Sequence, residues 1–166
     1  MELQKSKEKF YQTWGSIGTN WGINRTMAQI HALLLVTETP VSTDDIMAEL
    51  KISRGNANMN LRALMDWGLV QKEIVPGERM EYYVAEKDIW KVSKLIARER
   101  RKRELEPALR VLSELKADKE ADAASKQFRA RIEEIHKFTS MTDSILERYT
   151  QSNDTWFFKL FRYIIK

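Results

Sequence analysis

One stretch of the chain, residues 53–70, combines residue types that can hydrogen-bond to the edges of DNA bases. It reads SRGNANMNLRALMDWGLV, with asparagines at positions 56, 58 and 60 and arginines at positions 54 and 62. Asparagine is a mediocre helix former, so helix stability does not account for three of them. An Asn amide can pair with adenine through both its oxygen and its nitrogen, and an Arg guanidinium can pair with guanine. A helix built from this stretch is therefore expected to present base-reading groups.

A helical projection of this stretch separates an inward face from an outward face. At about 100° per residue, Ala57, Leu61 and Leu64 fall on one side, which is expected to pack inward. Asn60 lies near the boundary of that side, so its role is expected to be structural. The outward side and its edges carry the candidate DNA-reading residues: Arg54, Gly55, Asn56, Asn58, Met59 and Arg62.

Other positions around this helix suit contacts with the sugar–phosphate backbone. Ser53 is a good N-cap residue, and the free N–H groups at a helix N-terminus attract a phosphate. Gly55 would let the backbone approach that phosphate closely, and the flexible apolar Met59 suits a thymine methyl group. Lys51, in the preceding turn, and Arg79, in a following hairpin, lie where phosphate or minor-groove contacts are expected.

The elements before this helix are predicted from apolar periodicity. Apolar residues at helical spacing predict a first helix over about residues 2–18, and GTNWG (18–22) is interpreted as a loop. A second helix should run from about Met27 to near Pro40, because the residue before a proline avoids helical geometry. These two helices precede the stretch described above.

A short third helix and a turn should join this region to the candidate reader helix. Ser42 or Thr43 would cap the third helix, which is predicted to end near Leu50. LKIS (50–53) would form the turn. At the far end of the reader helix, Gly68 is placed to stop it in a left-handed conformation.

Two strand-like runs follow, and they complete a recognisable order of elements. LVQKEIV (69–75) and MEYYVAE (80–86) are joined by PGER (76–79), whose Pro-Gly centre favours a type II turn. Helix, turn, helix and hairpin in this order predict a winged helix-turn-helix over residues 21–90. The predicted fold class is mainly α with a small β-hairpin wing, extended by helices at residues 1–20 and 91–166.

The C-terminal region is predicted to be helical and to form a homodimer. Pro107 would restart or kink the helix, and apolar residues from Ala121 to Tyr149 predict a helix of about 30 residues. Its heptad-like spacing suits association of two helices in a two-fold symmetric dimer. Such a dimer would match a palindromic DNA site whose half-sites are about 34 Å apart. Antiparallel pairing within the chain, against the 105–115 helix, is the alternative, and both are expected. The predicted dimer residues are Phe128, Ile132, Ile135, Phe138, Ile145, Tyr149, Trp156, Phe157 and Phe161.

Two further groups of side chains each have two interpretations. The basic run at 98–103 could contact flanking phosphates, but a solvated helix paired with Glu99 and Glu104 is slightly favoured. Four aromatic residues near the N-terminus could line a pocket for an apolar or cationic effector. Aromatic residues at helical spacing more often belong to a core. The four are Phe10, Tyr11, Trp14 and Trp21.

Composition limits the classes of function. The chain has a net charge of +4, but residues 21–90 hold seven basic and ten acidic side chains, so overall charge does not indicate nucleic-acid binding. No cysteine, secretory signal or membrane-spanning run is found, so a cytoplasmic protein is expected and membrane association is not. His31 and His136 lack the spacing of a metal site, and no phosphate loop or nucleophile elbow is present. Neither a cofactor nor enzymatic activity is expected.

Three stretches together resemble one branch of a known family. WGINRTMAQIHALLL (21–35), SRGNANMNLRALMDWGLV and PGERMEYYVAE (76–86) resemble the GbsR branch of the MarR-type winged-helix transcriptional regulators, with the resemblance covering about residues 10–115. It implies an intracellular regulator that binds operator DNA as a homodimer, often with modulation by a small molecule. Repression is the commoner outcome for such folds. Ala57 is a departure, since many relatives carry a larger aliphatic residue there.

A different class of function stays open on the sequence alone. The same fold could serve as a protein–protein adaptor that does not bind DNA. The acidic balance of residues 21–90 is its best support. The feature that discriminates between the two is the outward face of residues 54–62 together with Arg79.

Overall fold

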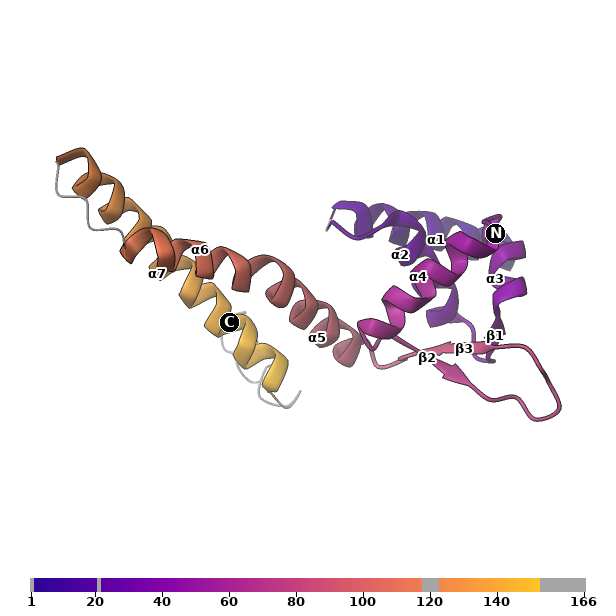
Figure 1. Ribbon diagram of the computed structural model, residues 1–166. Helices are drawn as coiled ribbons and strands as arrows, with labels where there is room; N and C mark the ends of the chain where they lie inside the picture. The colour runs from indigo at the N-terminus through magenta and orange to yellow at the C-terminus, as the bar shows by residue number, and fades with distance from the viewer. Residues whose placement is uncertain (1, 21, 118–122, 153–166) are drawn as a thin grey trace, which may run out of the picture. The chain divides into compact units, whose positions relative to one another are not determined.

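The computed structural model describes residues 2–20, 22–117 and 123–152, and the chain divides into two compact units, Met1–Val92 and Ser93–Lys166. Helices dominate both units, with a small antiparallel sheet in the first, so the predicted fold class is confirmed (Figure 1). The helices of the first unit are α1 (Leu3–Asn20), α2 (Arg25–Val36), α3 (Thr43–Leu50), α4 (Arg54–Asp66) and the start of α5 (Ile89–Arg100).

α1 and α2 pack closely because two buried glycines of α1 face α2. A Cβ atom at Gly18 would lie 2.6 Å from the Cβ of Ala28, and one at Gly15 would lie 2.8 Å from the Cγ of Gln29. The predicted loop at residue 18 was therefore wrong. The helix continues to Asn20, because Gly18 permits a close helix contact and does not form a turn.

The C-terminus of α2 is capped by a lysine from a distant part of the chain. Lys87 Nζ donates to the main-chain oxygens of Leu34, at 2.8 Å, and Leu35, at 3.0 Å, and also to that of Thr37. A cation at this position satisfies carbonyl groups that have no partner within the helix and complements the helix dipole. α2 ends at Val36, earlier than the position predicted from Pro40.

Two N-caps position the helix-turn-helix. Ser42 Oγ accepts a hydrogen bond from the Asp45 N–H at 3.1 Å, and the Asp45 carboxylate accepts one from the Ser42 N–H at 3.3 Å. Lys51, with φ of 53°, ends α3 in the left-handed region. Ser53 Oγ then accepts from the Asn56 N–H at 3.3 Å and caps α4. The predicted caps at Ser42 and Ser53 are confirmed.

The sheet has three strands in the order β1-β3-β2. These are β1 (Val41–Ser42), β2 (Val70–Glu73) and β3 (Tyr82–Ala85), all antiparallel. β2 and β3 form the predicted hairpin but are shorter than the predicted runs. β1 was not predicted; it pairs with Tyr82 and Tyr83 of β3 and so ties the start of α3 to the wing.

Two glycines with positive φ determine the turns on either side of β2. Gly68, with φ of 72°, ends α4 as predicted. In the hairpin, the Glu78 N–H donates to the Val75 oxygen at 3.1 Å, and Gly77 has φ of 86°. This geometry fits a type II turn with Pro76 and Gly77 at its centre.

The core of the first unit lies between α2, α3, α4, the sheet and the start of α5. Ala57 is fully buried, and Leu61 and Leu64 are almost so, which confirms the inward face predicted for α4. The small Ala57 side chain still packs without solvent exposure. The largest fully buried apolar side chains of the unit are Ile30, Leu34, Ile46, Leu61, Leu64 and Val92.

The second unit is a two-helix hairpin. α5 continues through a π-helical turn (Arg101–Leu105) into α6 (Glu106–Ala117), and α7 (Ala123–Gln151) returns beside it (Figure 1). Pro107 follows the wide π turn closely, as expected where a residue without an N–H interrupts helical hydrogen bonding.

Side-chain contacts fix the antiparallel register of this hairpin. Lys116 pairs with Glu133 at 3.6 Å, and Ser113 hydrogen-bonds His136 at 3.1 Å. Nearer the start of α5, the Ser93 hydroxyl bonds to that of Tyr149. The predicted pairing within the chain is therefore confirmed.

Candidate nucleic-acid interface

The outward face predicted for α4 is open to solvent. Arg54, Gly55, Met59 and Arg62 are exposed, and Met59 is 59% exposed. Asn58 is half-buried between them and makes no side-chain hydrogen bond within the described residues. These five residues form one surface, which we call the reader face.

The remaining two asparagines of α4 are joined to each other. Asn60 is only 3% exposed, and its Nδ2 donates to the main-chain oxygen of Asn56 at 2.9 Å and to its Oδ1 at 2.7 Å. Asn60 is thus structural, as expected. Asn56 is half-buried, and its side-chain oxygen already accepts one hydrogen bond, so its amide nitrogen is the freer group for contact with a base.

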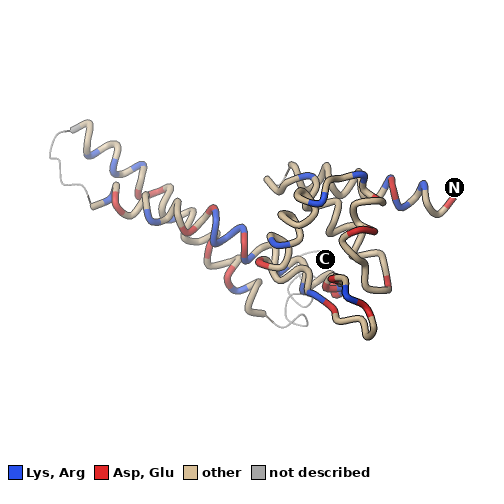
Figure 2. Tube along the Cα trace, turned by 45° about the vertical axis from the view of Figure 1, so that its right-hand side comes forward, with Lys and Arg blue, Asp and Glu red and all other residues tan. Residues whose placement is uncertain are grey.

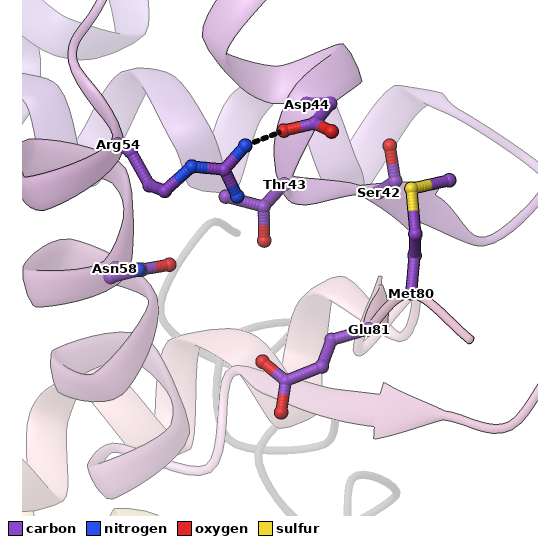
Figure 3. A pocket seen from close by; sticks show the side chains of 7 residues that line it. All are labelled: Ser42, Thr43, Asp44, Arg54, Asn58, Met80 and Glu81. Atoms are coloured by element: carbon purple, nitrogen blue, oxygen red, sulfur yellow. Dashed lines mark hydrogen bonds and ion pairs between the residues drawn. The ribbon is translucent and has the colours of Figure 1, made fainter.

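Arg54 is paired with an acidic residue that the sequence did not single out. Its Nη2 donates to Oδ1 of Asp44, in the first turn of α3 (Figure 3). The pair borders a cavity of about 150 Å³, into which Asn58 points and across which Glu81 faces Arg54. No local pattern indicates this pair, because ten residues and a left-handed turn separate the partners.

Arg62 lies beside the base of the wing. Lys72 Nζ pairs with Glu81 Oε1, and the Tyr83 hydroxyl donates to Glu81 Oε2 at 2.8 Å. The hydrogen bonds from Lys72 and Tyr83 hold the pKa of Glu81 below its ordinary value, and the charge of Arg62 acts in the same direction. α4 also packs against β2, so Arg62 and the hairpin lie on adjoining elements.

The two predicted backbone-contacting residues, Lys51 and Arg79, are both exposed. The wing also presents two exposed apolar side chains that sequence reasoning missed, Ile74 and Met80. The sequence could have indicated them, because each lies close to the Pro-Gly turn at the tip of a hairpin, where an apolar side chain has no core to pack into. Apolar side chains beside a cation suit insertion into a minor groove.

The basic run at 98–103 is largely neutralised by neighbouring carboxylates. Arg100 pairs with Glu104 at 2.9 Å and Arg103 with Glu99 at 3.2 Å. Arg101 makes two hydrogen bonds to Asp143 of α7, at 2.6 and 3.1 Å. Basic and acidic residues alternate along this unit (Figure 2). The solvated, paired helix is thus the better interpretation of this run.

The N-terminal aromatic residues belong partly to the core. Phe10 and Trp14 contact each other with their rings tilted by 37° and their centroids 5.6 Å apart, and Trp14 Nε1 donates to Nδ1 of the buried His31 at 3.4 Å. Tyr11 is buried and lines a cavity of about 380 Å³ bordered by α1, α2, β1 and α3. Trp21 lies outside the described residues.

The predicted dimer residues that lie within the described ranges separate into two sets. Ile132 is buried, and Tyr149 bonds Ser93, so both serve the hairpin itself. Trp156, Phe157 and Phe161 lie outside the described residues. The others remain exposed on one side of α7, together with Met141: Phe128, Ile135, Phe138 and Ile145. Within the described ranges, each helix is too short or too polar to cross a membrane.

The reader face lies within the part of the chain that matches a known protein family. Residues 21–79, which contain α2, α3, α4 and the first part of the wing, match the model of the MarR family. A crystal structure described as that of a transcriptional regulator matches with a TM-score of 0.62 and 20% identity. The match covers 89% of this chain and 99% of that one, so the two share a fold over nearly their whole lengths. No curated protein matches the chain.

Proposed function

We propose that this protein is a sequence-specific transcriptional regulator of the MarR type, from its GbsR branch, that binds a palindromic operator as a homodimer and represses by occlusion. The observation that carries the proposal is the reader face. α4, the capped second helix of the helix-turn-helix, carries three solvent-accessible side chains: Arg62, Asn58 and Met59. It lies beside a wing that carries Arg79. The match of residues 21–79 to the MarR family model supports the MarR-type, DNA-binding part of this proposal.

The geometry suits a division of labour between the two grooves. α4 would enter the major groove, where Arg62 and Asn58 can reach guanine and adenine edges and Met59 a thymine methyl. Arg79, with Ile74 beside the same turn, would enter the adjacent minor groove. Lys51 would contact phosphate, which sets register but carries no sequence information.

A homodimer is supported by the apolar stripe on α7. Phe128, Ile135, Phe138, Met141 and Ile145 are exposed and recur every three to seven residues along α7, and exposed apolar side chains gathered in this way mark an interaction site. The stripe is separate from the α7 face that packs on α6. A second copy using the same stripe gives two-fold symmetry, which matches a palindromic site.

A small-molecule effector is better placed in the cavity beside Tyr11 than among the aromatic rings of Phe10 and Trp14, which contact each other. The volume of this cavity, about 380 Å³, falls in the range of ligand sites. Asp45 and Glu49 of α3 line it, so an occupant would act directly on the helix that precedes α4.

The experiment that tests the proposal is selection of bound fragments from a random duplex library, at about 150 mM salt to suppress nonspecific phosphate binding. The expected result is enrichment of an inverted repeat.

The adaptor function is the second candidate, because acidic residues outnumber basic ones over residues 21–90. Absence of enrichment with a folded dimer, across a panel of small molecules, would favour the adaptor.

A further inference from the structure

Asp44 restrains the arginine that begins the reader helix. The carboxylate lies in the first turn of α3, and the Arg54 guanidinium reaches from α4 to meet it (Figure 3). The two side chains are 53% and 59% exposed, respectively, so the pair lies on the surface that DNA would approach. Within the described residues only Nη2 of Arg54 is engaged, which leaves its other N–H donors for a second acceptor.

This pairing changes what Arg54 can bind. An arginine near a helix N-terminus is well placed to bind the nearest phosphate, and such a contact is the same for every DNA sequence. Asp44 offsets the charge of the guanidinium, so the pair attracts a phosphate less than a free arginine would. Glu81, on the other side of the 150 Å³ cavity, is itself paired with Lys72, so that lysine is not a free cation for a phosphate either. A neutral base edge does not depend on net charge, because it accepts a hydrogen bond from the remaining donors of Arg54.

We infer that Asp44 is a specificity-determining residue: it withholds Arg54 from phosphates and holds the guanidinium where a base edge can accept its remaining hydrogen bonds. The inference rests on the proposed DNA-binding function and deepens it. Asp44 acts through Arg54 and is therefore a positioning residue. The arrangement lowers affinity for DNA of any sequence and increases discrimination between sequences.

The test compares binding to two duplexes of equal length, the selected site and a scrambled version of it. Asp44→Asn should bind the scrambled duplex more tightly, with a salt dependence steeper by about 0.9 in log–log slope, because one more phosphate is neutralised. The ratio of affinities for the two duplexes should fall by about tenfold, the scale of one lost base contact. Asp44→Glu should keep most of the wild-type ratio.

Two controls separate this effect from charge and folding. Asp66→Asn removes an equal charge from the exposed far end of α4 and should leave the ratio unchanged. Adding Arg54→Ala to Asp44→Asn should abolish the gain on scrambled DNA. Circular dichroism establishes that each variant is folded.

The outcomes distinguish the two claims. A wild-type protein that discriminates, with an Asp44→Asn variant of unchanged or higher ratio, overturns the role of Asp44 alone. A wild-type protein that binds both duplexes equally or neither overturns the proposed function, and this inference with it. If Asp66→Asn lowers the ratio as much as Asp44→Asn, the effect is one of net charge and the inference is wrong.

Discussion

The buried amide of Asn60 donates to both the side-chain and the main-chain oxygen of Asn56, at 2.7 and 2.9 Å. This contact connects the inner face of α4 to the edge of its reader face. It also shows that the three asparagines are not equivalent. Asn60 is structural, Asn56 is half-engaged, and Asn58 keeps its whole amide for a base.

Removing the Asn60 amide should therefore reduce stability. Asn60→Ala leaves a small void and deprives Asn56 of its donor, so the free energy of unfolding should fall by about 1–3 kcal/mol. Urea denaturation measures this change. Asn58→Ala is the matched control on the same helix: it should change stability by less than about 0.5 kcal/mol but weaken binding to the selected site. Equal losses of stability in the two variants would contradict this assignment of roles.

The two helical glycines at positions 18 and 55 should respond oppositely to alanine. Gly18→Ala places a Cβ 2.6 Å from that of Ala28, and overpacking of this kind costs about 1–3 kcal/mol. Gly55 has no atom within 4 Å of a Cβ, so Gly55→Ala should stabilise the protein by up to about 1 kcal/mol. The same Gly55 variant should bind DNA more weakly if the backbone approaches a phosphate there. Thermal denaturation and DNA titration of both variants check these expectations.

Local signals explain why much of the fold could be predicted. The caps at Ser42 and Ser53, the stop at Gly68 and the Pro-Gly turn each depend on neighbouring residues alone. β1 could not be predicted in this way, because its two residues become a strand only by pairing with β3. Gly18 was misassigned, since a glycine that permits close helix packing looks the same in sequence as one that forms a turn.

The candidate site, like the fold, could be predicted only where it depends on residues that are close in the sequence. Helical periodicity predicted which side of α4 faces out, because that depends only on residues of α4. The Asp44–Arg54 pair and the proximity of Arg62 to Glu81 depend on how α3, α4 and the wing pack, and no spacing in the sequence encodes them. Lys87 is similar, because it caps a helix about fifty residues earlier.

His31 should make stability depend on pH. Burial lowers its pKa to about 4, so between pH 6.5 and 4 the unfolded chain binds a proton that the folded protein does not. The free energy of unfolding should fall as the pH is lowered through this window, by up to about 3 kcal/mol, and the contribution is fully present above pH 6.5. Protonation at Nδ1 would also break the hydrogen bond from Trp14.

Denaturant titrations at pH 7 and pH 4.5 measure this contribution when wild type is compared with His31→Gln. Glutamine stays neutral, so the variant should lose less stability on acidification. Carboxylates titrate equally in both proteins and cancel in the comparison. Identical losses in the two proteins would show that His31 does not titrate in this window.

The α7 stripe predicts the effect of a charge on assembly. Phe138 is 66% exposed, so Phe138→Asp should leave the hairpin folded but convert a dimer to monomer, because it buries a charge in the proposed interface. Ser144→Asp adds the same charge at an exposed position about 120° around α7 from Phe138, beyond the edge of the stripe, and should remain dimeric. Sedimentation equilibrium gives the masses. A dimer that survives Phe138→Asp would place the interface elsewhere.

The central claim is that the outward face of α4 reads DNA bases, and the affinity of Arg62→Ala for the selected duplex tests it most directly. The account predicts that binding weakens by about 1–3 kcal/mol, with relaxed preference at one base pair and unchanged folding. Arg110→Ala, an exposed arginine of α6, should lose far less on the same duplex. Wild-type affinity in a folded Arg62→Ala protein would contradict the account.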